Sequence, residues 1–184
     1  MPIGTGYREL IPRYVVTGAP GTGKSSVIRL LSHRFETIEE PARELIAEHA
    51  AATGEATLDG RPELFLKRVV QRSIDDFRSV SDATVVFFDR GLPDCVAYAS
   101  AYGMDPERFR QQAARFRYES PVFIASPWKE IHTPDPLLRA TFEQVEAFHL
   151  QLQSVYLLLG YELIELPTTS PSTRVEAITG RLHL

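Results

Sequence analysis

The sequence predicts an α/β fold in three layers, with a five-stranded parallel β-sheet covered by helices on both faces. Short apolar segments alternate with longer amphipathic ones through residues 13–184. Most strand candidates contain a short apolar run, as strands in the middle of such a sandwich do. No repeat, low-complexity tract or linker-like break interrupts this alternation. We therefore expect one domain over residues 13–184, preceded by an N-terminal extension at residues 1–12.

The first half of the domain is expected to contain three strands. A short apolar run at residues 13–17 ends at a glycine and predicts the first strand, and a helix follows from Gly23. A second strand is expected near residues 35–40, and Pro41 suits the first position of the next helix. Residues 62–80 place apolar side chains at helical spacing, and residues 84–89 form the clearest strand, a run of apolar residues ending in an acid.

The second half continues the alternation. Helices are expected from Pro93 and from Asp105-Pro106, and residues 121–125 form the fourth strand. Residues 126–139 contain three prolines and predict a long loop. From Ala140 the apolar positions advance by three and four, which predicts an amphipathic helix. A fifth strand at residues 161–166 and a closing helix at residues 170–182 complete the expected order.

Composition excludes several classes of protein. The 184 residues include 20 Lys and Arg and 24 Asp and Glu, a net charge of −4 that argues against a nucleic-acid or membrane partner. The longest apolar runs are far shorter than a bilayer span. Cys95 is the only cysteine, so an internal disulfide or a cysteine-built metal site is impossible. With no secretory signal visible, we expect a cytoplasmic location. The oligomeric state is open, with a homodimer as one option.

The strongest functional signal follows the first strand. Residues 18–25 fit the pattern G-x-x-x-x-G-K-[ST], in which glycines let backbone N–H groups point at a phosphate and a helix adds its positive end. Lys24 would reach the β- and γ-phosphates, and the Ser25 hydroxyl would bind Mg²⁺. A plain glycine-rich turn is disfavoured by the strand and helix on either side. We predict an ATP or GTP site made of Gly18, Ala19, Pro20, Gly21, Thr22, Gly23, Lys24, Ser25 and Ser26, with Thr168 beyond the fifth strand as a weaker contact for the base.

A carboxylate follows the second strand. Glu40 precedes a proline, which holds it in extended geometry. Because successive strand side chains point to opposite faces, we do not expect Glu39 and Glu40 in one pocket. Glu40 would accept the proton of an acceptor hydroxyl as a catalytic base. The alternative is an acidic helix start that interacts with the helix dipole.

The third strand ends in Asp89, in the form of a Walker B strand whose carboxylate holds Mg²⁺ directly or through water. Any buried strand can end in Asp, but the preceding phosphate loop favours the functional interpretation. Arg90 would bind a phosphate or form an ion pair with Glu40. Asp94 would help to bind the acceptor or serve only as an acid at the start of a helix.

The loop at residues 126–139 follows the fourth strand and is long enough to be a lid over the site. Trp128 is a candidate stacking surface for the acceptor, with a simple anchoring role as the alternative. Arg139 is a candidate clamp on the transferred phosphoryl group. The five histidines have no spacing typical of a zinc site or of a nucleophile–base pair.

Together these motifs resemble the nucleoside and nucleotide kinase branch of P-loop proteins. The Glu40-Pro41 pair looks like the Glu-Pro motif of deoxynucleoside kinases, whose Glu is the base, and Asp89-Arg90 is similar to the Asp-Arg motif of thymidylate kinases. Closer still, Glu40-x-x-Arg43-Glu44, the Trp-containing loop and residues 161–167 resemble the predicted-ATPase family labelled AAA. That family includes the ribosylnicotinamide kinase domain of the bacterial regulator NadR. The resemblance spans about residues 13–180 and implies the P-loop nucleoside triphosphate hydrolase fold with the kinase-type strand order 2-3-1-4-5.

Some features of related families are missing. The Asp-Gly-Phe-Pro-Arg segment of adenylate kinases and the Asn-Lys-x-Asp motif of small GTPases do not occur in the sequence. The chain also has no room for the helical lid domain of ring-forming AAA motors, so the AAA label does not imply a motor.

The function that these residues predict is a kinase that transfers a phosphoryl group from Mg·ATP to a hydroxyl of a small metabolite, with nucleosides and ribosyl compounds among the candidates. A nucleotide-binding regulatory ATPase or GTPase without such an acceptor is the alternative. In the kinase, the helical segment within residues 53–80 would lie on the acceptor side. Its catalytic residues would be Lys24, Glu40, Arg90 and Arg139, its metal ligands Ser25 and Asp89, and its acceptor-binding residues Glu40, Arg43, Phe65, Asp94 and Trp128.

Overall fold

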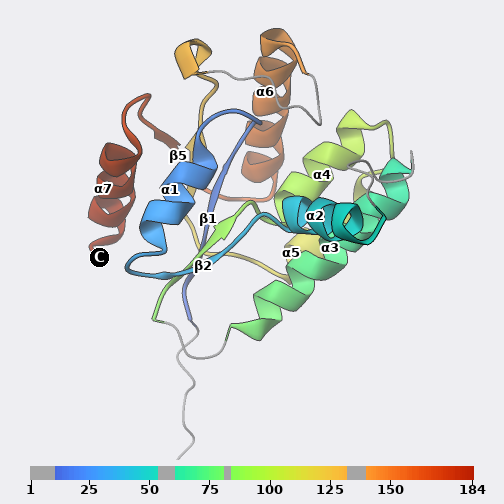
Figure 1. Cartoon of the computed structure of the whole chain (residues 1–184), viewed down its shortest axis with the longest axis horizontal. Helices are drawn as coiled ribbons and strands as arrows, with labels where there is room; N and C mark the ends of the chain where they lie inside the picture. Colours follow the sequence, from blue (N-terminus) through green and yellow to red (C-terminus); the bar gives the residue numbers. More distant parts are fainter. Residues whose placement is uncertain (1–10, 54–60, 81–83, 132–139) are drawn as a thin grey trace, which may run out of the picture.

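A five-stranded parallel sheet forms the centre of the molecule (Figure 1). A computed structural model describes residues 11–53, 61–80, 84–131 and 140–184. The strand order is β2-β3-β1-β4-β5, with every neighbouring pair parallel. The fold class and the kinase-type order predicted from the sequence are therefore confirmed. The strands are β1 (Arg13–Gly18), β2 (Glu36–Ile38), β3 (Val86–Asp89), β4 (Val122–Ala125) and β5 (Leu163–Leu166).

The helices alternate with the strands as the sequence predicts. Their starts follow local signals: Pro41 and Pro62 occupy first helical positions, and Thr141 caps its helix by accepting a hydrogen bond from the Gln144 N–H. In the described ranges no helix combines the length and apolarity that a bilayer span needs. The helices are α1 (Lys24–Leu31), α2 (Pro41–Thr53), α3 (Pro62–Ser79), α4 (Leu92–Ala101), α5 (Glu107–Arg115), α6 (Phe142–Leu158) and α7 (Pro171–Leu182), with a short 3₁₀ helix η1 (Lys129–Ile131).

The sheet buries both of its faces. Successive residues of a strand point to opposite faces, so Val15 and Phe88 join one apolar cluster while Val16 and Phe87 join the other. The first cluster lies under α2 to α6, and the second under α1 and α7, which lie together on the other side in Figure 1. This burial explains the unbroken apolar runs of the central strands β3 and β4, whereas the edge strands β2 and β5 also carry polar residues.

The functional edge of the sheet is where the strands end. Val16 of β1 is in register with Asp89, the last residue of β3, and Gly18 with Ala125, the last residue of β4. Gly18 has φ +142°, and a Cβ there would lie 2.3 Å from the Ala125 carbonyl oxygen. Only glycine fits this close passage. The carboxyl end of β1 is thus held between the ends of β3 and β4.

Candidate active site at the carboxyl edge of the sheet

The loop between β1 and α1 forms a cradle of main-chain groups. Gly23 caps α1 in the left-handed region with φ +82°, which leaves the N–H groups of the first helical turn open to a ligand. The Thr22 hydroxyl donates to the Ala19 carbonyl at 2.9 Å and closes the loop on itself. The predicted phosphate-binding residues therefore form one compact turn at the start of a helix, the arrangement that anion binding requires.

Lys24 lies over this loop and is almost completely buried. Its Nζ donates to the Ala19 carbonyl at 2.9 Å. Burial, helped by the charge of Arg90, lowers the pKa of Lys24 to about 8, although nearby carboxylates, with Asp89 foremost, oppose the shift. A buried ammonium with a depressed pKa is stabilised by a negative charge, so this site favours an anion.

Ser25 and Asp89 meet beside the loop. The Ser25 hydroxyl lies 3.5 Å from Oδ2 of Asp89, and Oδ1 of that buried carboxylate has no hydrogen-bond partner among the described residues. Burial raises the pKa of Asp89 to about 6 even though Lys24 acts in the opposite direction. A hydroxyl beside an unsatisfied carboxylate oxygen suits Mg²⁺, which takes oxygen ligands and completes its shell with phosphate and water. No group of three or more His, Cys, Asp or Glu able to hold a metal occurs within the described ranges.

Glu40 lies in the short connection between β2 and α2, between two arginines. Its Oε1 accepts a hydrogen bond from Arg90 Nε and its Oε2 one from Arg43 Nε, both at 2.9 Å. Burial alone would raise the pKa of Glu40, but Arg90, Lys24 and Arg43 together lower it to about 2. Glu39 is exposed, so the two glutamates do not share a pocket, as the sequence predicts, although both lie beyond the end of β2. Glu40 is therefore an ionised, fixed carboxylate at the edge of the sheet.

Arg90 connects three parts of the site. Besides Glu40, its Nη1 donates to the Gly18 carbonyl at 3.0 Å and to Oδ1 of Asp94 at 2.9 Å. Its backbone has φ +71°, a left-handed conformation that costs a non-glycine residue about 1–3 kcal/mol. The ion pair with Glu40, one of the two roles expected for Arg90, is present.

Asp94 is the centre of a buried hydrogen-bond network. Its Oδ1 accepts from the Thr17 hydroxyl at 2.7 Å as well as from Arg90. Its Oδ2 accepts from the Tyr156 hydroxyl at 2.6 Å and from the Gly91 N–H at 3.1 Å. Four donors on one carboxylate tie β1, α4 and α6 to Arg90. Asp94 is thus more than an acid at the start of a helix, although it does stand in the first turn of α4.

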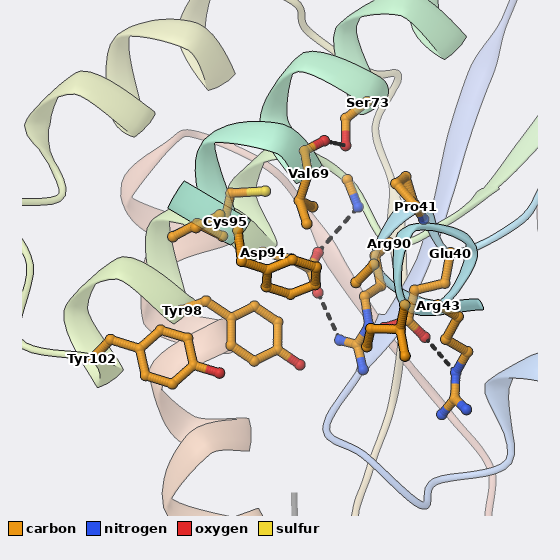
Figure 2. A pocket seen from close by; sticks show the side chains of 15 residues that line it. Glu40, Pro41, Arg43, Val69, Ser73, Arg90, Asp94, Cys95, Tyr98 and Tyr102 are labelled. Carbon is orange, nitrogen blue, oxygen red and sulfur yellow. Dashed lines mark hydrogen bonds and ion pairs between the residues drawn. The ribbon is translucent and has the colours of Figure 1, made fainter. Parts of the chain in front are cut away.

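A pocket opens beside Glu40, between α2, α3 and α4 (Figure 2). It holds a cavity of about 90 Å³ that continues into an open mouth. Four of the five predicted acceptor-binding residues line it, and Trp128 does not. The lining residues are Glu40, Pro41, Ala42, Arg43, Ile46, Phe65, Leu66, Val69, Ser73, Arg90, Gly91, Asp94, Cys95, Tyr98 and Tyr102.

Trp128 lies instead beside the phosphate loop, against Arg174 of α7. The Arg174 guanidinium is 5.6 Å from the centre of the Trp128 ring and donates to the carbonyls of Thr22 at 2.7 Å and Pro167 at 2.8 Å. Trp128 thus lies near the phosphate loop and outside the pocket that the other four predicted acceptor-binding residues line. Thr168 is exposed next to Pro167, near the same arginine. Arg139 lies outside the described residues.

Comparison with known proteins fits this geometry. A family model described as AAA domain matches residues 13–174. The chain belongs to the AAA-domain family. The resemblance that the sequence motifs indicate is therefore confirmed. A search of curated proteins finds no match to this AAA-domain protein.

Solved structures share the fold of this AAA-domain protein. A NadR protein in complex with NR superposes with a TM-score of 0.67 at 21% identity, covering 94% of this chain and 50% of that one. The chain thus spans about half the length of the NadR structure. Thymidylate kinase from Ehrlichia chaffeensis gives 0.63 at 15% identity, covering 94% and 99% of the two chains. Deoxyadenosine kinase from M. mycoides with bound dATP gives 0.60 at 14%, covering 94% and 100%.

Nucleotide binding by this AAA-domain protein is expected to weaken above about pH 8. Lys24 attracts phosphate only when it is protonated, and its pKa of about 8 in the free protein means that this charge is lost as the pH rises through that value. Calorimetry with ATP and EDTA should show Kd rising by up to about tenfold per pH unit above 8, with proton uptake on binding. Lys24→Arg, which keeps its charge, should remove this dependence. A Kd that stays constant to pH 9.5 would contradict the assignment.

Sequence reasoning missed three side chains that shape the site of this AAA-domain protein. Tyr156 stands out in the sequence only as part of the apolar stripe of α6, and nothing local shows that its hydroxyl reaches Asp94. Arg174 crosses from α7 to the phosphate loop, a contact 152 residues apart. Tyr98 has a weak signal, because it and Tyr102 form an aromatic i,i+4 pair just after the Asp89-Arg90 motif.

Proposed function

We propose that this protein is a Mg·ATP-dependent kinase that phosphorylates a hydroxyl group of a small molecule. The observation that carries the proposal is the placement of Glu40, a buried ionised carboxylate that lines a pocket and is linked through Arg90 to the start of the phosphate loop. A nucleotide site alone would not need a fixed carboxylate beside a separate pocket. The shared fold with kinase structures supports the same reaction class.

In the proposed reaction the acceptor oxygen attacks the γ-phosphorus of ATP. A new O–P bond forms, the bond between that phosphorus and the β–γ bridging oxygen breaks, and ADP leaves with its electron pair. The hydroxyl proton passes to Glu40 and then to water. The acceptor would lie in the pocket, with its hydroxyl toward Glu40 and the phosphate loop.

The low pKa of Glu40 defines how it would act. At about 2, the pKa keeps the side chain ionised at neutral pH, so it can accept a hydrogen bond from the hydroxyl before reaction. Such a weak base takes the proton only when the growing O–P bond has made the hydroxyl acidic, late in the transfer. Orientation of the nucleophile is then its main contribution, and this orientation depends on the two arginines that hold it.

The remaining residues would neutralise the negative charge of the phosphates. Lys24 would contact the β- and γ-phosphates, and Ser25 with Asp89 would hold Mg²⁺. When bound, Mg²⁺ neutralises phosphate charge and orients the triphosphate. Arg90 reaches the loop carbonyl of Gly18 and would add positive charge near the transferred group. The loop at residues 126–139 remains the predicted cover that excludes water.

The test is the fate of labelled phosphate. The purified protein is incubated with Mg²⁺, γ-labelled ATP or GTP, and pools of hydroxyl-bearing metabolites. The kinase predicts label in a small organic molecule, formed faster than free phosphate. Label that appears only as inorganic phosphate, at a rate that no metabolite changes, would instead identify a regulatory nucleotide hydrolase. Lys24→Ala is the control, because it should abolish either reaction by weakening binding of the triphosphate.

A further inference from the structure

Resting on the nucleotide site of the proposed kinase, we infer that Arg174 is a positioning residue for the phosphate loop. It would fix the Thr22–Gly23 peptide so that the Gly23 N–H faces the phosphates, and its charge would help to attract them. Three features support this role: the contact of Arg174 with the loop, the conformational freedom of the peptide that it holds, and a buried charge without a carboxylate partner among the described residues.

Arg174 reaches the phosphate loop from the start of α7. Its Nη1 donates to the Thr22 carbonyl at 2.7 Å, and its Nε donates to the Pro167 carbonyl at 2.8 Å. The guanidinium lies 5.6 Å from the centre of the Trp128 ring, and only 2% of Arg174 is exposed. Two charge-assisted hydrogen bonds and a packed aromatic ring hold this side chain in place. Arg174 therefore connects α7 firmly to the loop.

The contact with Thr22 also determines where the next N–H points. The Thr22 carbonyl and the Gly23 N–H belong to one planar trans peptide, in which the two groups point in opposite directions. Because Arg174 holds the carbonyl, the N–H is directed away from Arg174. Among the described residues the Gly23 N–H has no hydrogen-bond partner. It is thus a main-chain donor at the start of a helix, where phosphate groups bind.

Glycine leaves this peptide free to turn over. Gly23 has φ +82°, and a residue without a Cβ adopts positive and negative φ about equally well. Rotation of the Thr22–Gly23 peptide would turn the carbonyl oxygen toward the phosphates, which it would repel. The hydrogen bond from Arg174 opposes this rotation before any ligand arrives. Such pre-organisation strengthens binding because the loop does not have to be ordered by the ligand.

Arg174 also carries a buried charge that no carboxylate balances within the described part of the chain. Burial lowers the pKa of Arg174, and its Nη2 is buried without a hydrogen-bond partner. Arg90, in contrast, is paired with Glu40 and Asp94 at 2.9 Å. An unpaired buried charge costs stability. A bound triphosphate would supply the negative charge that Arg174 lacks in the free protein.

The experiment compares Arg174→Met with the unaltered protein, with inorganic tripolyphosphate and ATP as the two probes. Methionine keeps an unbranched apolar stem but removes the charge and both donors. Calorimetry should show both probes binding to the variant about tenfold or more weakly. Tripolyphosphate tests the loop alone, since it has neither a base nor a ribose. A tripolyphosphate affinity within about twofold of that of the unaltered protein would overturn the inference.

The NMR signal of the Gly23 amide reports on the peptide itself. In the unaltered protein it should be sharp and should shift when tripolyphosphate binds. In Arg174→Met the peptide should exchange between two orientations, which relaxation dispersion detects on the microsecond to millisecond timescale. A Gly23 signal that neither moves nor broadens in the variant would overturn the inference. Arg174→Lys keeps the charge but not the two-carbonyl fork, should lose affinity severalfold, and takes the place of Arg174→Met if that variant does not fold.

Two controls on α7 separate positioning from a structural role. Arg181→Met removes an exposed arginine that pairs with Glu162 at 3.1 Å, and it should leave tripolyphosphate binding unchanged. Ser170→Ala removes the hydroxyl that caps α7, so it should lower the unfolding temperature without altering the Gly23 signal. If Ser170→Ala weakened tripolyphosphate binding as much as Arg174→Met does, Arg174 would act only by holding the start of α7.

Transfer of labelled phosphate separates this inference from the proposed function. Tripolyphosphate binding that depends on Arg174, with no transfer of label to any metabolite, would refute the kinase and leave the role of Arg174 intact. Transfer that continues in Arg174→Met with an unchanged KM for ATP would refute the role of Arg174 and leave the kinase intact.

Discussion

Replacing Glu40 with glutamine is expected to lower the rate of phosphoryl transfer by about 10²–10⁴-fold, because the variant loses both the orientation of the acceptor hydroxyl and the group that takes its proton. The substitution keeps the length of the side chain but removes the charge that orients the acceptor hydroxyl and receives its proton. ATP affinity should not fall, because Glu40 lines the proposed acceptor pocket and its hydrogen-bonded link to the phosphate loop runs through Arg90. Single-turnover transfer and calorimetric titration with ATP measure the two quantities separately.

Glu39→Gln is the matched control. Glu39 is exposed one residue earlier in the chain, so its loss should leave both quantities unchanged. If Glu40→Gln slowed transfer only a few fold with a good acceptor present, Glu40 would have no role as the base. If it instead weakened ATP binding strongly, the carboxylate would serve mainly to hold Arg90 beside the phosphate loop.

The fold was predictable because its signals are local. Strands such as β3 are buried on both faces, so unbroken apolar runs in the sequence predict them. Prolines such as Pro41 and Pro62 predict where helices begin. The phosphate loop was predictable for the same reason, since its chemistry depends on eight consecutive residues. Glu40 and Asp89 followed from the rule that ligands gather where parallel strands end.

The rest of the site depends on contacts between distant residues. A strand end places a residue at the functional edge but does not say on which side of the phosphate loop it lies. The sequence therefore predicts Trp128 on the acceptor side, and only the structure shows its ring against Arg174 of α7. Asp94 was ambiguous because its partners Thr17 and Tyr156 lie 77 and 62 residues away. Only the folded structure shows that Asp94, an acid in the first turn of a helix, is also the centre of a buried hydrogen-bond network.

Asp94→Asn is expected to lower the free energy of unfolding by about 3–5 kcal/mol, the typical cost of breaking a buried ion pair. Each carboxylate oxygen of Asp94 accepts two hydrogen bonds, so neither position suits a group that donates. The amide of asparagine would turn an NH₂ group toward two of those donors and leave Arg90 with one carboxylate partner fewer. An acid that only interacts with a helix dipole would cost about 0.3–1 kcal/mol, so urea unfolding distinguishes the two roles.

Tyr156→Phe provides the graded comparison. It removes one of the four donors to Asp94 and should cost about 1.5–3 kcal/mol, the range for a hydrogen bond to a charged group. Because Arg90 keeps its ion pairs with Asp94 and Glu40 in this variant, the rate of transfer should change little. Asp94→Asn should lower that rate as well, since it loosens the arginine that holds Glu40. Equal stability losses in the two variants would show that Asp94 acts through Tyr156 alone and that Arg90 is positioned by Glu40 and the Gly18 carbonyl.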